Sequence, residues 1–275
     1  MVRHLGAKAL ASLLTAGLAC ASAAAFADPL DHTRTLPTVN DALLDSEFSK
    51  YVALHPGDWV GARDLVEELG GTMVISGDNG EVVTAEQATA RFQALNGNGT
   101  EIETYAWPSL AFTANVAVVT SGPTDTTVSI AGAWNWKDSF IGQGSPVDIA
   151  AILVNKSCGT WSGYTSSTYK WNGTKTSGRS SLRSGGTGST GPGWNIIDGV
   201  SNFENLVDNG TVAAVYNRSA CSSTDKKNIQ AEFVYEGNSG GSVLSVGLGW
   251  GGFSVSYSGS PNTQTRSSGS ETVPY

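Results

Sequence analysis

The chain has 275 residues, a formal net charge of −8 and only three histidines and three cysteines. An acidic chain repels phosphate backbones, so we expect no nucleic-acid partner. A zinc site needs more cysteine and histidine ligands than the chain offers, and no phosphate, calcium or dinucleotide motif is present, so we expect no metal and no cofactor.

Residues 1–27 have the features of a secretory signal peptide. Arg3 and Lys8 supply positive charge, an apolar stretch follows, and Ala25-Phe26-Ala27 fits an A-x-A cleavage site. Loss of the two basic residues would change the net charge to −10. No later apolar run approaches the ~20 residues of a membrane-spanning helix. We therefore expect a secreted, extracellular protein without a transmembrane segment.

Residues 28–103 are predicted to form a small acidic α+β segment. They contain fourteen acidic and four basic residues. The apolar spacing predicts a helix over 41–54, a second one capped by Asp58, and a third over 85–95 that starts from a Thr84–Gln87 capping box. A hairpin is expected between the second and third helices.

Residues 104–275 are predicted to form an antiparallel, β-sandwich-like domain. The helical period disappears near residue 100, and short runs with strand-like composition follow, separated by turn residues. The expected strands are 101–107, 112–119, 127–136, 147–154, 167–171, 174–176, 212–216, 231–235, 244–250 and 253–257. Asn172-Gly173 and Asn209-Gly210 are each predicted to form a hairpin turn.

The last two expected strands show the clearest alternation in the chain. Large apolar residues occupy every second position and alternate with serine and glycine: Leu244, Val246, Leu248 and Trp250, then Phe253, Val255 and Tyr257. Gly251-Gly252 separates the two runs. This pattern predicts a hairpin with one buried face, on which Leu244 lies beside Val246.

Two cysteines remain after the signal peptide, Cys158 and Cys221. An even pair in an exported chain is most simply a disulfide. By closing a long loop it would stabilise the fold by about 4 kcal/mol.

The pentapeptide Gly237-Asn-Ser-Gly-Gly241 resembles the nucleophile loop of chymotrypsin-like secreted serine proteases. Over these five residues, the resemblance implies that Ser239 is a nucleophile and that glycine amides form an oxyanion hole. Such a serine needs a histidine base, and beyond the signal only His32 and His55 are available. The same residues also suit an ordinary hairpin loop. Ser239 is thus a weak catalytic candidate, and the interpretation without catalysis is preferred.

The Ser- and Gly-rich stretch 177–193 is predicted to be a surface loop. Arg179 and Arg183 within it are candidates to contact an acidic ligand, and the alternative is a solvated spacer.

Eight tryptophans invite a carbohydrate hypothesis, because sugars stack on exposed indole rings. Trp161, Trp171 and Trp194 lie in polar, glycine-rich surroundings and are the candidate exposed binding residues. A glycosidase would also need a pair of acids. Its candidates in this domain are Asp138, Asp148, Asp198, Glu204 and Asp208.

The leading functional hypothesis is a secreted, non-catalytic recognition protein for an extracellular ligand, with polysaccharides and other cell-surface molecules as candidates. Two alternatives remain open. The first is a membrane-acting, pore-forming protein, although the terminal strands are shorter than the 9–11 residues that span a bilayer. The second is an enzyme, either a glycosidase or a serine hydrolase that uses Ser239.

Overall fold

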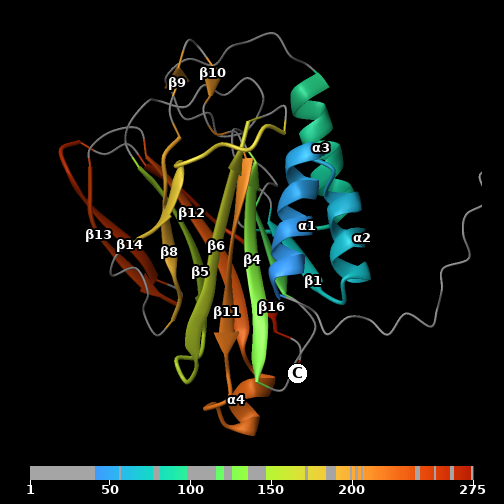
Figure 1. Cartoon of the computed structure of the whole chain (residues 1–275), viewed down its shortest axis with the longest axis vertical. Helices are drawn as coiled ribbons and strands as arrows, with labels where there is room; N and C mark the ends of the chain where they lie inside the picture. Colours follow the sequence, from blue (N-terminus) through green and yellow to red (C-terminus); the bar gives the residue numbers. More distant parts are fainter. Residues whose placement is uncertain are drawn as a thin grey trace, which may run out of the picture. The chain divides into compact units, whose positions relative to one another are not determined.

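The structure of the chain is a computed structural model in which antiparallel strands predominate (Figure 1). It describes residues 41–55, 57–76, 81–97, 116–120, 126–135, 147–170, 173–183, 190–198, 200–201, 204–205, 207, 209–238, 242–250, 252–260, 263–273 and 275. These residues all belong to one compact unit, Leu36–Tyr275. The prediction of a mainly β, sandwich-like fold is confirmed.

Helices flank the strands. Those among the described residues are α1 (Asp41–Leu54), α2 (Trp59–Glu68), α3 (Ala85–Gly97) and α4 (Ser223–Lys227). The first three confirm the predicted helices, and their caps explain where they start. The Asp58 side chain accepts a hydrogen bond from the Gly61 amide at 3.0 Å, and Thr84 and Gln87 bond each other's amides reciprocally. The short α4 was not predicted.

One six-stranded antiparallel sheet, the first sheet, has the order β2-β1-β3-β4-β11-β6. Its strands are β1 (Thr72–Ser76), β2 (Val82–Val83), β3 (Val116–Thr120), β4 (Thr127–Asn135), β6 (Thr160–Tyr169) and β11 (Asn209–Asn217). β1 pairs with β3 over five residues. A strand of the acidic segment therefore belongs to the same sheet as strands of the C-terminal part, and a domain boundary near residue 103 stays a prediction.

The second sheet has the order β15-β12-β5-β8-β7, with β16 also paired to β12. Its strands are β5 (Asp148–Val154), β7 (Ser180–Leu182), β8 (Gly193–Ile196), β12 (Gln230–Asn238), β15 (Thr263–Ser267) and β16 (Glu271–Thr272). Two separate two-stranded pairs complete the described strands: β9 (Val200–Ser201) with β10 (Glu204–Asn205), and β13 (Ser242–Gly249) with β14 (Gly252–Ser258).

The main hydrophobic core lies between the two sheets. Alternate residues of β4 and β11 meet alternate residues of β5, β8 and β12, so the period-two pattern of each strand supplies one buried face. Trp134 is central, with its ring centroid 5.1 Å from that of Tyr235 and 6.4 Å from that of Phe233. Gly132 is required beside it, because a Cβ there would lie 2.0 Å from the Phe233 ring.

The outer faces of the two sheets are covered by different elements. Helices α1 and α2 pack on the first sheet, where Phe48, Trp59 and Val66 meet the small residues Ala131 and Ala213. The β13–β14 hairpin covers the second sheet through Leu248 and Trp250, which pack against Ala151, Leu153 and Val234. Figure 1 shows these two coverings on opposite sides of the sandwich.

Some local predictions were wrong. Asn209-Gly210 does not form a turn but opens β11, where Asn209 pairs with both Asn135 and Tyr169. The stretch predicted as a loop over 177–193 contains β7 and the first residue of β8, because its serine-rich part pairs with β8 at the sheet edge. The expected strand 101–107 lies outside the described residues.

Candidate functional site

The β13–β14 hairpin is one of two two-stranded pairs in the described structure that are separate from the two large sheets. Its strands pair only with each other, in a register that shifts between Val243 and Ser245. The shift is a β-bulge at Leu244, which has no cross-strand partner and is 63% exposed. The prediction that Leu244 shares the buried face was therefore wrong, because the extra residue places Val243, opposite Tyr257, on that face.

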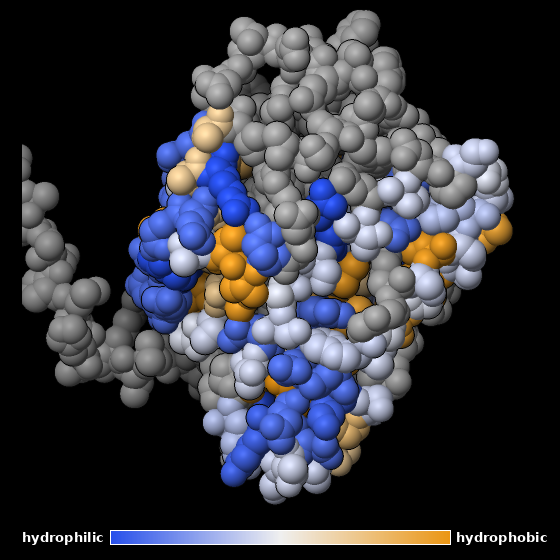
Figure 2. Space-filling view, turned by 180° about the vertical axis from the view of Figure 1, so that it is seen from behind, coloured by the Kyte–Doolittle hydropathy of each residue, from blue (hydrophilic) through white to orange (hydrophobic). Residues whose placement is uncertain are grey.

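The hairpin has two chemically different faces. The inner face carries valine, leucine and aromatic side chains that are half-buried against the second sheet. The outer face carries Ser242, Ser245, Gly247, Ser254, Ser256 and Ser258, all exposed. On this side of the molecule, at the right in Figure 2, weakly polar residues surround small apolar patches.

Two side chains of the second sheet's β7–β8 region fasten β13 from the edge. The Arg183 guanidinium donates to the Leu244 carbonyl at 3.2 Å and to the Asn195 side-chain oxygen at 2.9 Å. The Thr190 hydroxyl donates to the Leu248 carbonyl at 2.7 Å. Both contacts use backbone carbonyls of β13, so they fix the position of the strand whatever its side chains are.

Glu236, a buried acid of the second sheet, binds β14 through a hydrogen bond. The Tyr257 hydroxyl donates to the Glu236 carboxylate, whose other oxygen accepts from the Thr265 hydroxyl at 2.9 Å. Glu236 is buried in β12. Burial raises the pKa of Tyr257 well above its usual range, and the hydrogen bond to Glu236 raises it further. Tyr257 therefore stays protonated and acts as a donor.

A second buried carboxyl, that of Asp148, lies near Glu236, where β5 begins beside the end of β12. Asp148 opens β5 and is fully buried, accepting from the Tyr235 hydroxyl and from the Asn238 amide, both at 2.7 Å. Its carboxyl also hydrogen-bonds to that of Asp198, which follows β8. Burial raises the pKa of Asp148 well above its usual range, and the Asp198 charge adds to this. Asp148 therefore keeps its proton to a higher pH than an exposed aspartate does.

This pair does not suit glycoside hydrolysis. The two carboxyls of a glycosidase are about 5 Å or more apart, because the sugar lies between them. Asp148 and Asp198 are in direct contact and both are buried. Asp138 and Asp208 lie outside the described residues, as does the side chain of Glu204.

The three candidate tryptophans have different environments. Trp194 is 1% exposed, and the prediction that it is a surface residue was wrong: it occupies the inner face of β8, so its indole fills the core. Trp161 is half-buried on the edge strand β6, with its ring centroid 4.9 Å from that of Tyr216. Trp171 lies outside the described residues.

The two candidate arginines are not equivalent. Arg183 holds β13, as described above, so its guanidinium already has protein partners. Arg179 is half-buried, and its carbonyl accepts from the Ile197 amide at 2.7 Å. A contact of either residue with an acidic ligand stays a prediction.

Ser239 lies outside the described residues. The preceding Asn238 ends β12, and its amide is bonded to Asp148. His55 directly follows α1, and its ring is tilted against that of Tyr51 with the centroids 4.6 Å apart. The catalytic role of Ser239 stays a prediction.

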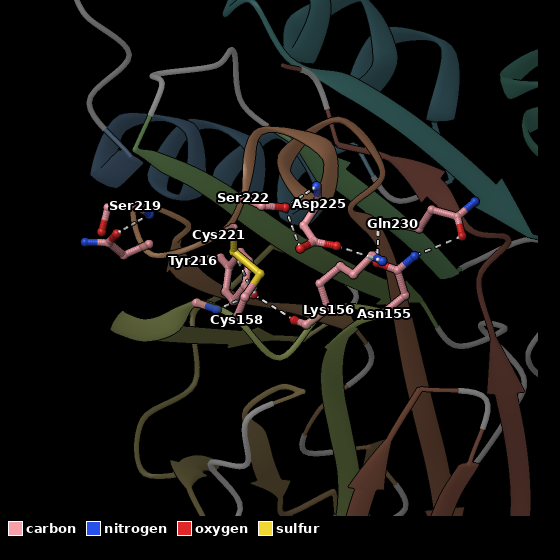
Figure 3. Close-up of a disulfide and its surroundings, with 11 residues drawn as sticks. Asn155, Lys156, Cys158, Tyr216, Ser219, Cys221, Ser222, Asp225 and Gln230 are labelled. Atoms are coloured by element: carbon pink, nitrogen blue, oxygen red, sulfur yellow. Dashed lines mark hydrogen bonds and ion pairs between the residues drawn. A yellow bond between two sulfur atoms is a disulfide. The ribbon is translucent and has the colours of Figure 1, made fainter.

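The predicted disulfide is present. The Cys158 and Cys221 sulfurs are 2.04 Å apart and connect the β5–β6 loop to the segment between β11 and α4 (Figure 3). Beside it, the Tyr216 hydroxyl accepts from the Gly159 amide at 2.8 Å and donates to the Lys156 carbonyl at 2.7 Å. Lys156 also forms an ion pair with Asp225 of α4. This cluster closes one end of the sandwich.

Within the described ranges, no group of three or more histidine, cysteine, aspartate or glutamate residues is arranged to hold a metal ion. No helix in these ranges is long and apolar enough to cross a membrane.

Sequence reasoning missed the anchors of the hairpin. One local signal for the bulge is present: Val243 and Leu244 are adjacent apolar residues in a run that otherwise alternates. Glu236 has a weaker signal, as one of two acids in the strand Gln230–Asn238 and the one nearer its end. The pairing of Glu236 with Tyr257 has none, because it depends on where the hairpin folds back.

Comparisons with known proteins give little further information. No family model matches the chain, and no curated protein matches it. One similar solved structure comes from work on pH-induced modulation of Streptococcus parasanguinis adhesion by Fap1 fimbriae: 12% identity, TM-score 0.30, covering 58% of this chain and 81% of that one. Another is ACE19, the collagen binding subdomain of Enterococcus faecalis surface protein ACE: 7% identity, TM-score 0.31, covering 60% and 98%. At these TM-scores neither likeness informs the fold or the function of this chain.

Proposed function

We propose that the protein is an extracellular recognition protein that binds its ligand without catalysis. The observation that carries this proposal is the β13–β14 hairpin, a separate layer whose outer face is exposed. Its inner face and its backbone are fastened by Arg183, Thr190 and Glu236. Binding residues usually lie on a surface that a rigid scaffold holds in place and that does not contribute to the hydrophobic core.

Export supports the extracellular assignment. The features of residues 1–27 fit a signal peptide, and the Cys158–Cys221 disulfide suits an oxidising compartment. The buried acids support the non-catalytic assignment, since Asp148 and Glu236 accept hydrogen bonds from other protein groups and Asp198 is buried beside Asp148. Their chemistry is used for structure.

The proposal is tested by co-sedimentation of the mature protein with insoluble polysaccharides and with whole cells, followed by assay of the supernatant for reducing sugar. We expect retention without sugar release. Release of reducing sugar would contradict the non-catalytic assignment. Absence of retention on every surface tested would contradict the recognition function.

Two further assays address the enzymatic and membrane alternatives. A fluorophosphonate probe should not label the protein, and labelling that is lost in Ser239→Ala would make it a serine hydrolase. Dye-filled liposomes should stay intact when the protein is added. Dye release would favour the pore-forming alternative over recognition.

A further inference from the structure

The outer face of the hairpin is uniform in chemistry. Between Glu236 and Arg266 the sequence contains no charged residue. The exposed outward positions are serines, apart from Gly247 and the bulged Leu244. A solvent-facing ribbon usually carries lysine or glutamate, which keep sheet edges from associating. Their absence leaves a neutral, hydroxyl-rich surface in an otherwise acidic protein.

The outward serines of β14 recur at every second residue, whereas on β13 the bulge places Ser242 and Ser245 three residues apart. Residues two apart on one strand are about 6.7 Å apart, and adjacent strands lie about 4.8 Å apart. Ser242 is opposite Ser258 and Ser245 is opposite Ser256, with the last two hydroxyl oxygens 2.5 Å apart. Gly247, opposite Ser254, adds no side chain above the ribbon. The outer face therefore carries several serine hydroxyls on two neighbouring strands, each able to donate and to accept hydrogen bonds.

Leu244 adds an apolar contact to this strip. The bulge turns its side chain out to 63% exposure, and the Arg183 bond to its carbonyl holds the backbone there. A pyranose ring offers the same combination, with hydroxyl groups around its edge and C–H groups on its faces. The hydroxyls and the leucine thus match one class of ligand.

Charge selects among polymers. Residues 237–265 contain no charged side chain, so a polymer of either charge finds no ion-pair partner along the hairpin, and a polycation would be attracted to the fourteen acidic residues of 28–103 instead. We propose that the outer face of β13–β14 is the ligand-binding surface and that its ligand is an uncharged, polyhydroxylated polymer, a neutral polysaccharide, lying along the ribbon. This inference rests on the proposed recognition function.

The test uses the mature protein with insoluble cellulose and chitin as neutral probes and a polygalacturonate gel as the anionic one. We expect retention on at least one neutral polymer and none on the anionic gel. Ser256→Arg and Ser254→Arg place a long charged side chain on the outer face and should each weaken retention about tenfold or more. Ser157→Arg, an exposed serine beside the disulfide, is the matched control and should bind like the parent protein.

Conservative variants keep the test independent of folding. Ser256→Thr retains the hydroxyl and should retain binding, whereas Leu244→Ser should weaken it without changing thermal unfolding. Retention that all hairpin variants preserve would overturn the inference and leave the recognition function intact. Retention on the polygalacturonate gel instead of the neutral polymers would overturn the ligand class. Size-exclusion chromatography would show whether the parent protein is a dimer. If the hairpin variants lost retention because they became monomers, the ribbon would be a contact with a second copy of the chain, and the inference would be overturned.

Discussion

The two outer faces of the sandwich are covered in opposite ways. On the first sheet, the helices bury large side chains completely: Phe48, Trp59 and Val66 are all at most 1% exposed. On the second sheet, the hairpin leaves Leu248 and Trp250 only partly buried and depends on hydrogen bonds from Arg183 and other polar residues. The helices contribute stability by burying apolar side chains. The β13–β14 hairpin buries less apolar surface and is held in position by hydrogen bonds.

The largest expected effect is on the helical side. Trp59→Ala removes a fully buried indole and should lower the free energy of unfolding by about 3–5 kcal/mol. Trp250→Ala, on the hairpin, should lower it by less than about 2 kcal/mol because its ring is partly solvated. Urea unfolding measures both. Equal losses would contradict the difference between the two coverings.

The next effect concerns the buried anchor of the hairpin. Tyr257→Phe leaves the Glu236 carboxylate with only the Thr265 hydroxyl among its observed donors, and should destabilise the fold by about 1–3 kcal/mol. Hydrogen exchange should accelerate in β13 and β14 more than in β4 and β11. Tyr275→Phe, at an exposed position, is the control. Unchanged exchange in the hairpin would show that this bond does not hold it.

The raised pKa of Asp148 predicts a pH dependence of the protein's stability. Burial raises the pKa of Asp148 in the folded state above its unfolded value, so the folded state binds more protons between the two values. The contribution of Asp148 to stability should therefore be complete below about pH 4 and be lost as pH rises through the raised pKa. Urea midpoints across this range should slope less in Asp148→Asn. Identical slopes would contradict the assignment.

The smallest effect on stability is expected at Arg183, beside the edge of the hairpin. Arg183→Gln removes the half-exposed guanidinium that bonds Leu244 and Asn195, and should lower the free energy of unfolding by less than about 1 kcal/mol. The change should be visible as faster hydrogen exchange at β13. Arg179→Gln should leave β13 unchanged. A loss as large as that of Trp59→Ala would mean that the hairpin is a structural element of the core.

Much of the fold was predictable because its signals are local. Asp58 and the Thr84–Gln87 pair mark helix starts through contacts within one turn, and alternation marked most strands. The hairpin turn predicted at Asn209-Gly210 was wrong because that prediction used only the local signal. Asn-Gly suits a turn by itself, but pairing with β4 and β6 on both sides outweighed that preference.

The candidate site was less predictable because it depends on long-range pairing. Trp194 has polar, glycine-rich neighbours in sequence, and only its place on the inner face of β8 buries it. Arg183 lies in a stretch with loop composition, yet it meets Leu244 from 61 residues away. The uncharged run that includes the hairpin was visible in the sequence, whereas the bulge that decides which residues face outward was not.

Hydrogen-exchange footprinting with a soluble neutral oligosaccharide tests the central claim most directly. The mature protein would be compared with and without chitohexaose or cellohexaose, with peptides covering β13, β14, β6 and the helices. The account predicts protection confined to 242–258, and its loss in Ser256→Arg. Protection at β6 around Trp161, with the hairpin unaffected, would contradict it.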